Sequence, residues 1–396
     1  MDVRIIPRRL RGTVTPPPSK SYAHRFVLAE LLAGCDTFSV SPELSDDIRA
    51  TLSCAAALRR DAFPALDCGE SGSTLRFLLP IALALRGGGA FSGRGRLMRR
   101  PLTPYFDIFA EKGIEWKQDG DALTVRGKLT PGEYRLPGDV SSQFVTGLLF
   151  ALPVLDGDSV IRLTSPLQSA AYVEMTLETL RQSGVKIERP DAQIFKIPGG
   201  QRYRAPETPV EADWSQAAFW YAANYLGGGV EIQGLNPRSA QGDRVIAELC
   251  RTLDRNASAL AKIDVSGIPD LLPPLAVMAA CRRGPTRFTR AGRLRLKESD
   301  RLQSVAELLR AFGVASEIGP DFLTVAGGGP RLDAPIVADG ANDHRIVMAV
   351  SVLACVCAEP VTIQGAEAVG KSYPDFFTHY RQLGGQVEIL SDNGTK

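Results

Sequence analysis

The chain has 396 residues, more than one hydrophobic core usually serves, so its length favours two domains. Its 46 lysine and arginine residues nearly balance 44 acidic ones, and a net charge of +2 argues against a nucleic-acid surface. Hydrophobic residues make up 44% and charged residues 23%, the balance of an ordinary globular protein. Any anion must therefore be bound by local clusters of arginine and lysine.

The cysteines and histidines do not form a metal-binding pattern. Seven cysteines show no paired ligand spacing, and the three histidines, at positions 24, 344 and 379, are scattered. This predicts reduced thiols in a cytoplasmic protein and argues against a histidine-based metal site. The N-terminus lacks the apolar region of a secretory signal, and the longest apolar run, 346–358, is too short to span a membrane and predicts a buried helix. We expect a monomer with no nucleic-acid or membrane partner.

Six junctions along the chain repeat one pattern, in which a strand-like stretch enters a polar turn and then an apolar helix. Each turn offers a serine, aspartate or asparagine oxygen that can cap the helix. A second helix type ends in glycine before a β-branched residue, as at Gly113 and Gly184. The repeating unit is therefore predicted to be βαβαββ. The junctions lie at Ser19-Lys20-Ser21, Glu70-Ser71-Gly72, Asp139-Val140-Ser141, Ala212-Asp213, Pro269-Asp270 and Asn342-Asp343.

The junction spacings divide the chain further. The first and fourth units span 50 and 57 residues, against 71 to 73 for the other complete spacings, which predicts truncated hairpins in units one and four. Proline-rich stretches at 15–18 and 206–209 suit defined crossings between domains. We predict one domain from residues 1–15 and 211–396 and another from 16–210, with three repeats each. An ordinary doubly wound α/β sheet is the alternative, but no glycine-rich nucleotide motif follows a strand.

The first cation cluster lies at helix starts. Lys20 opens a predicted helix, where its charge faces the positive end of the helix dipole. An anion bound by Lys20, serine hydroxyls and free backbone N–H groups would explain this placement, and a capped surface helix is the alternative. Arg345 and Lys371 also lie at or just before helix starts, and the loop 94–101 holds four arginines.

A second cation cluster lies in the segment 293–301. Arg293, Arg295 and Lys297 alternate, so they would share one face if the segment were extended. Lys297 and Arg301 would be like charges at i, i+4, at a cost of about 0.2–0.5 kcal/mol on an isolated helix. A solvated salt-bridge surface could neutralise them. An anionic ligand resolves the repulsion better, because guanidinium groups match carboxylate and phosphate geometry. Several such clusters beside repeat junctions suggest anions bound between the two domains.

Nine motifs in chain order carry a resemblance to a known family. They are PSKSYAHR, ESGSTLR, RRP, DVSSQF, SAAYVEM, IPDL, LKESDR, NDHR and GKSYPDFF. On these motifs the chain resembles the 5-enolpyruvylshikimate-3-phosphate synthase family over almost its whole length, as a short, divergent bacterial-type member. The resemblance implies an inside-out α/β barrel of two domains that close onto their substrates. It also implies transfer of the enolpyruvyl group of phosphoenolpyruvate to the 5-hydroxyl of shikimate 3-phosphate by addition and elimination. This chemistry requires neither a metal nor an organic cofactor.

The resemblance also implies a role for each motif residue. The residues expected at shikimate 3-phosphate are Lys20, Ser21, Arg25, Ser141, Ser142, Ser169, Tyr172, Asp270, Arg293 and Lys297. Those expected at phosphoenolpyruvate are Lys20, Gly72, Arg100, Gln143, Arg301, Arg345 and Lys371. Asp270 would act as the base and Glu298 as the acid, while Lys20 and Lys371 stabilise the departing phosphate. An acid that donates near neutral pH needs a raised pKa, which the surrounding cations oppose.

Four positions depart from the family pattern: Glu70, Phe77, the pair Ala170-Ala171, and Arg293. Glu70 would repel phosphoenolpyruvate unless an arginine pairs with it, and Arg76 is a candidate. These departures leave sensitivity to glyphosate-type inhibitors unpredicted.

Two other functions are alternatives to the one that the resemblance implies. The related transferase that acts on UDP-N-acetylglucosamine typically carries a reactive cysteine in the loop matching 94–101, which has none here. A non-catalytic sugar-phosphate binder of the same fold would not need both Asp270 and Glu298.

Overall fold

The computed structural model describes residues 1–332 and 334–390, which form two compact units. Unit 1 comprises Met1–Pro17 and Glu211–Lys396, and unit 2 comprises Pro18–Val210. The whole of unit 2 is therefore inserted into unit 1 between two of its elements. The predicted crossing at 15–16 and the observed division after Pro17 both fall in the proline-rich segment.

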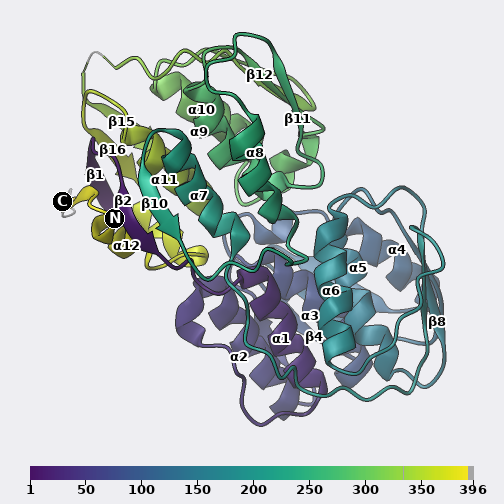
Figure 1. Cartoon of the computed structure of the whole chain (residues 1–396). Coiled ribbons are helices and arrows are strands. Elements are labelled where there is room, and N and C mark those ends of the chain that lie inside the picture. Colours follow the sequence, from purple (N-terminus) through teal and green to yellow (C-terminus); the bar gives the residue numbers. More distant parts are fainter. Residues whose placement is uncertain (333, 391–396) are drawn as a thin grey trace. The chain divides into compact units, whose positions relative to one another are not determined.

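Unit 2 is built on helices that pack side by side, with α1 against α2 and α6, and α3 against α2 and α5 (Figure 1). The helices are α1 (Lys20–Leu32), α2 (Asp46–Arg60), α3 (Gly72–Arg86), α4 (Thr103–Lys112), α5 (Ser142–Ala151) and α6 (Ala170–Gln182). The strands are β3 (Ala65–Asp67), β4 (Gly88–Ser92), β5 (Glu115–Asp119), β6 (Ala122–Arg126), β7 (Gly132–Leu136), β8 (Ser159–Leu163) and β9 (Ile194–Ile197). They form sheets in the orders β3-β4-β6-β5 and β7-β8-β9.

Unit 1 has three sheets, in the orders β10-β2, β11-β12-β14-β13 and β15-β16-β1-β17. The helices are α7 (Trp214–Tyr225), α8 (Ile246–Thr252), α9 (Leu272–Ala280), α10 (Arg301–Ala311), α11 (His344–Ala354) and α12 (Phe376–Gln382). The strands are β1 (Asp2–Ile6), β2 (Arg11–Val14), β10 (Gly229–Ile232), β11 (Ala261–Asp264), β12 (Thr286–Thr289), β13 (Ser316–Ile318), β14 (Phe322–Val325), β15 (Ile336–Asp339), β16 (Val361–Gln364) and β17 (Gln386–Leu390).

The three four-stranded sheets repeat one topology, as the βαβαββ pattern predicted. In β3-β4-β6-β5 and in β11-β12-β14-β13, a parallel pair is followed by an antiparallel hairpin. In the third sheet of this kind the N-terminal strand β1 takes the place of the inner hairpin strand. Val3 lies opposite both Ile363 of β16 and Ile389 of β17, and β1 runs antiparallel to both strands. The start of the chain therefore completes its last repeat.

The predicted truncations in units one and four are confirmed. Among the described residues, β3 is the only strand between α2 and α3, and β11 the only one between α8 and α9. The chain thus has room for a helix pair in these units but not for the extra hairpin. Unit three departs from the prediction of a full hairpin, because β9 is the only described strand between α6 and α7 and a single bridge joins Glu188 to Lys196.

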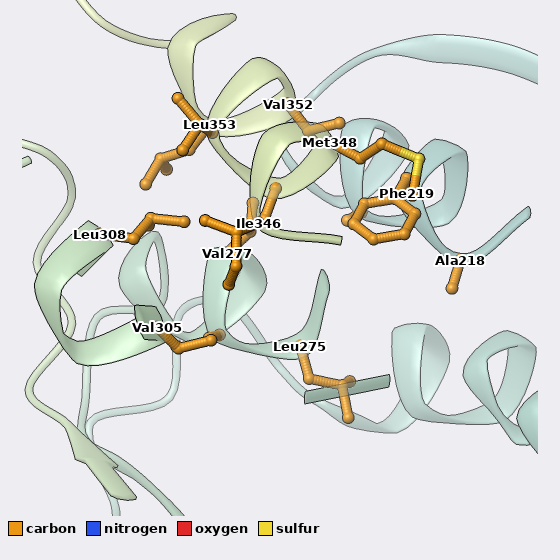
Figure 2. Close-up of a cluster of buried hydrophobic side chains, with 14 of the residues drawn as sticks. Ala218, Phe219, Leu275, Val277, Val305, Leu308, Ile346, Met348, Val352 and Leu353 are labelled. Carbon is orange, nitrogen blue, oxygen red and sulfur yellow. The ribbon is translucent and has the colours of Figure 1, made fainter. Parts of the chain in front are cut away.

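The core of unit 1 lies among α7, α9, α10 and α11 (Figure 2). Every residue of α11 is buried, which confirms the buried helix predicted from the apolar run at 346–358. Ile346 and Met348 of this helix pack with Phe219 of α7, Val277 of α9 and Leu308 of α10 in one cluster. A helix that is apolar on all sides is stable only when neighbours surround it. Each such buried side chain contributes about 1.5–3 kcal/mol.

The described helices include none with the length and apolarity that crossing a membrane requires.

Candidate active site

The predicted helix caps place much of the site. Side-chain oxygens of Ser71, Ser141, Asp213 and Asp343 accept hydrogen bonds from backbone N–H groups in the first turns of α3, α5, α7 and α11. Two of the six junctions differ. Ser19 makes no side-chain cap bond at α1, and a short 3₁₀ helix, Pro269–Leu271, precedes α9. At that junction the Asp270 carboxylate contacts cationic side chains instead.

In unit 2, Lys20 is held by a carboxylate that sequence reasoning missed. Its Nζ lies 2.7 Å from Oδ2 of Asp47, and both side chains are largely buried. Asp47 lies in the first turn of α2, and its carbonyl accepts hydrogen bonds from the hydroxyls of Thr51 and Thr74. The only sequence signal was an aspartate near a helix start, which usually indicates dipole compensation. The structure shows that it also orients the lysine at the start of α1.

Arg25 brings together residues from α1 and α6. It is 2% exposed, and it donates to the backbone carbonyls of Ser21 at 2.5 Å and Tyr172 at 2.7 Å, and to Oγ1 of Thr176 at 2.9 Å. The ring of Phe77, one of the departures from the family pattern, lies 5.4 Å from the guanidinium. Burial lowers the pKa of Arg25 to about 10, so the group stays charged near neutral pH.

Three more of the expected serines lie at helix starts in unit 2. Ser141 caps α5, and Ser142 is its buried first residue. Ser169, just before α6, has a φ of 54°, in the left-handed region that non-glycine residues rarely adopt. Such strain often marks a functional position.

Gly72, Arg76, Arg100 and Gln143 lie together at the start of α3. Oε1 of Gln143 accepts from Arg76 at 2.7 Å, and its Nε2 donates to Ser73 at 3.0 Å. A Cβ atom at Gly72 would come within 2.7 Å of Nη1 of Arg100 and 3.1 Å of Nη1 of Arg76. Two guanidinium groups therefore flank a helix N-terminus, an arrangement suited to an anion. Sequence reasoning considered Arg76 only as a partner for Glu70.

The side chain of Glu70 lies against the arginine loop. A Cβ atom at Gly95 would come within 2.9 Å of its carboxyl group. The proposed pairing of Glu70 with Arg76 stays a prediction.

In unit 1, Arg301 joins the two predicted catalytic carboxylates. It is 1% exposed, and its Nη1 lies 2.8 Å from Oδ1 of Asp270 while its Nη2 lies 2.6 Å from Oε2 of Glu298. Its Nε and Nη2 also contact Asp343, at 2.9 and 3.2 Å. Burial alone would lower the pKa of Arg301, but these carboxylates raise it well above its ordinary value.

Asp270 in turn is surrounded by cations. Its carboxylate lies 3.3 Å from Nζ of Lys297 and 3.2 Å from Nη2 of Arg345, in addition to Arg301. Arg345 also donates to Oγ of Ser215 at 3.0 Å. Burial lowers the pKa of Lys297 even though Asp270 favours its charged form.

The segment 292–296 is not extended, so the condition under which Arg293, Arg295 and Lys297 would share one face is not met. Gly292–Leu296 is a 3₁₀ helix, in which alternate residues do not share a face. Arg295 is accordingly directed elsewhere, to Asp300 at 2.9 Å and to the carbonyl of Gly319 at 2.8 Å. Arg293 lies within this helix and stays a predicted ligand contact.

Lys371 ends the 3₁₀ helix Ala366–Lys371, and its Nζ donates to the carbonyl of Asn342 at 2.8 Å. Asn342 and Ala341 have φ values of 49° and 53°, so two successive non-glycine residues adopt the left-handed region just before α11. The structure thus brings Lys371 to the turn that precedes Arg345.

Asp243 is a buried carboxyl that sequence reasoning missed. It lies in the 3₁₀ helix Gly242–Val245, and burial together with the charge of Asp270 raises its pKa to about 7. No motif or spacing distinguished it from a surface aspartate.

Most of the chain matches one protein-family model. The model described as EPSP synthase (3-phosphoshikimate 1-carboxyvinyltransferase) matches residues 60–380. The chain belongs to the EPSP synthase family. EPSP stands for 5-enolpyruvylshikimate 3-phosphate, so the resemblance drawn from the nine motifs is confirmed.

Relatives and solved structures agree with this assignment. The chain is similar to the 3-phosphoshikimate 1-carboxyvinyltransferases of Clostridium kluyveri, at 38% identity, and Clostridium acetobutylicum, at 39%, and each match covers 98% of this chain and 99% of the relative. An EPSP synthase structure from Acinetobacter baumannii matches with a TM-score of 0.75 at 22% identity, over 98% of this chain and 100% of that one. The enolpyruvyl transferase NikO from Streptomyces tendae matches with a TM-score of 0.76 at 18% identity, over 98% of both chains. These two structures confirm the predicted fold class.

Within the described ranges 1–332 and 334–390, no three histidine, cysteine, aspartate or glutamate side chains are grouped to hold a metal ion.

Proposed function

We propose that the protein transfers the enolpyruvyl group of phosphoenolpyruvate to the 5-hydroxyl of shikimate 3-phosphate and releases inorganic phosphate. The observation that carries this proposal is the cluster around Arg301. One buried guanidinium contacts both Asp270 and Glu298, the carboxylates required as base and acid, and Arg345 lies on the same Asp270. Two arginines beside two carboxylates suit a carboxylate-bearing substrate on which protons are added and removed.

Unit 2 supplies groups for phosphate recognition. Ser21, Arg25, Ser141, Ser142, Ser169 and Tyr172 would hold shikimate 3-phosphate, and all lie on or beside the first turns of α1, α5 and α6. Lys20, Gly72, Arg100 and Gln143 would hold the phosphate of phosphoenolpyruvate, with Gly72 opening α3 and Gln143 in the first turn of α5. Helix N-termini favour phosphate because their free N–H groups and dipoles point at the anion.

Unit 1 supplies the groups that move protons. Asp270 would take the proton of the 5-hydroxyl while that oxygen forms a bond to the central carbon of phosphoenolpyruvate. Contacts to Lys297, Arg301 and Arg345 stabilise the ionised carboxylate that this step needs. Lys297 and Arg293 would contact the same substrate.

Glu298 would deliver a proton to the methylene carbon, giving a tetrahedral intermediate that still carries the phosphate. Its carboxylate lies 2.6 Å from Nη2 of Arg301. The substrate carboxylate, bound to Arg301 and Arg345, would compete for this guanidinium and loosen its hold on Glu298. Loss of a methyl proton and of phosphate, stabilised by Lys20 and Lys371, would then restore the double bond.

This scheme needs only anion binding and proton transfer, so we propose that it proceeds without a metal or organic cofactor. We also propose a monomeric, cytoplasmic enzyme. Size-exclusion chromatography of the purified chain would test the first of these two points.

The function is tested by phosphate release from chelator-treated protein given phosphoenolpyruvate with shikimate 3-phosphate. A parallel reaction contains UDP-N-acetylglucosamine instead. We expect phosphate release in the reaction with shikimate 3-phosphate and none in the reaction with UDP-N-acetylglucosamine. Release with the nucleotide sugar would assign the related transferase, and ligand-induced thermal stabilisation without release would assign a non-catalytic binder.

A further inference from the structure

Asp343 is a buried carboxylate to which none of the proposed steps assigns a part. It is fully buried and precedes α11, where it accepts the backbone N–H of Arg345 at 3.0 Å. A capping aspartate of this kind needs only one oxygen for that bond. The other oxygen accepts from Oγ of Ser299 at 3.1 Å and from Nε of Arg301 at 2.9 Å.

The contact with Arg301 has two points and so fixes the orientation of the guanidinium. Nε contacts Oδ2 of Asp343 and Nη2 contacts Oδ1, at 2.9 and 3.2 Å. A paired contact on one edge of a planar guanidinium removes its rotational freedom. The opposite edge, Nη1 and the second N–H of Nη2, is thereby directed at Asp270 and Glu298.

The exposures of the three carboxylates around Arg301 differ. The Asp343 side chain is 0% exposed, whereas those of Asp270 and Glu298 are 15% and 20% exposed. An incoming ligand can therefore reach the edge of Arg301 that faces Asp270 and Glu298. The edge of Arg301 that contacts Asp343 is closed to a ligand and keeps its contact.

Asp343 is also linked to the other two cations of unit 1 that are expected at phosphoenolpyruvate. Its cap bond fixes the first turn of α11, which carries Arg345. The residue before it, Asn342, holds a strained left-handed conformation and accepts Nζ of Lys371 through its carbonyl. Asp343 and its neighbour Asn342 thus contact, or fix the backbone beside, all three cations: Arg301, Arg345 and Lys371.

We propose that Asp343 is a positioning residue for the transfer reaction, which holds Arg301 so that its Nη1 and Nη2 edge, shared with Asp270 and Glu298, can meet the carboxylate of phosphoenolpyruvate. This inference rests on the proposed role of Arg301. The purely structural alternative is that Asp343 caps α11 and neutralises a buried charge, with no bearing on which ligand binds.

The test is Asp343→Asn in the full-length enzyme. Asparagine caps helices about as well as aspartate, so the start of α11 is retained while the anionic partner of Arg301 is lost. We expect the KM for phosphoenolpyruvate, at saturating shikimate 3-phosphate, to rise roughly 10- to 100-fold. The Kd for shikimate 3-phosphate alone should change less than about twofold.

Asp300→Asn is the matched control. Asp300 caps α10, the helix that begins with Arg301, but its carboxylate contacts Arg295. The control should leave the KM for phosphoenolpyruvate within about twofold of the parent. An unchanged KM in Asp343→Asn, or equal losses for both substrates, would overturn the proposal.

Two further variants keep the result interpretable. Ser299→Ala removes only the hydroxyl that supports Asp343, so it should raise the KM for phosphoenolpyruvate by a few-fold even if Asp343→Asn does not fold. No rise in Ser299→Ala would then count against the proposal. Arg301→Gln separates the two failures. If Arg301→Gln leaves the KM for phosphoenolpyruvate unchanged, the proposed role of Arg301 is wrong. If Arg301→Gln raises this KM and Asp343→Asn does not, only the positioning role of Asp343 is wrong.

Discussion

Two buried arginines, one in each unit, have opposite surroundings. Arg25 of unit 2 contacts two backbone carbonyls, a hydroxyl and an aromatic ring, all uncharged, and burial lowers its pKa to about 10. Arg301 of unit 1 contacts three carboxylates, which raise its pKa. Under the proposed function, the first arginine would offer its charge to the phosphate of shikimate 3-phosphate. The charge of the second is already balanced by carboxylates, which would suit a group that shares these partners with a substrate.

The largest expected effect on catalysis comes from removing the charge of Arg301, and removing that of Arg25 provides the comparison. Arg301→Gln should lower kcat/KM roughly 10³-fold, about 4 kcal/mol, because three carboxylates then repel one another and the substrate. Arg25→Gln should instead weaken shikimate 3-phosphate binding and leave Asp270 and Glu298 undisturbed. Steady-state kinetics with each substrate varied would check this. Equal effects of the two variants on both substrates would break the comparison.

The carboxylate-rich character of unit 1 also predicts a pH-dependent stability. The pKa of Asp243 is raised to about 7, so ionising it in the folded protein is costly. Its contribution favours the folded state at low pH and is lost as pH rises from about 4 to about 7. Asp243→Asn should remove this loss and be more stable than the parent at pH 8 by roughly 2–4 kcal/mol. Urea unfolding at pH 5 and pH 8 would measure it, and an equal difference at both pH values would refute the assignment.

A smaller effect is expected at Gly72 in unit 2. A Cβ there would lie 2.7 Å from Nη1 of Arg100, so Gly72→Ala must displace that guanidinium. We expect the KM for phosphoenolpyruvate to rise roughly 10-fold, about 1.4 kcal/mol, with little change in shikimate 3-phosphate binding. Kinetics and direct titration would compare the two. Gly113→Ala, where no atom lies within 4 Å but φ is 67°, separates backbone strain from displacement of an arginine.

The smallest effect concerns the uncharged surroundings of Arg25. Phe77→Leu removes a ring 5.4 Å from the guanidinium while keeping an apolar side chain in the core. The loss of this cation–π contact should weaken shikimate 3-phosphate binding a few-fold, about 0.5–1 kcal/mol. Calorimetric titration would detect it. Tighter binding in the variant would show that the ring hinders rather than supports Arg25.

The sequence predicted the features that depend on neighbouring residues. Caps at Ser71 and Asp343 could be predicted because a capping oxygen and its N–H group lie within three positions. The repeats could be found because each is a local pattern. Whole-length motif similarity then supplied the family, which no single cluster established.

The sequence could not predict contacts between repeats. Asp47 meets Lys20 across 27 positions, and Asp343 meets Arg301 across 42. The position of each aspartate near a helix start could be recognised, but nothing local indicates which distant cation it contacts. The alternation at 293–297 left the backbone open, because a period of two gives a shared face only in an extended segment. The structure has a 3₁₀ helix there, Gly292–Leu296.

In the last sheet β1 lies between β16 and β17, and its place beside β16 can be followed in Figure 1. This has a consequence for synthesis on the ribosome. Residues 18–210 form unit 2 without a break, so this unit can fold as soon as it has emerged. β1 and β2, although made first, must wait: Val14 pairs opposite Ile232, and Val3 opposite Ile363 and Ile389. Unit 1 is therefore completed only when the end of the chain returns to its beginning, and a prematurely terminated chain would carry a finished unit 2 beside two unpaired N-terminal strands.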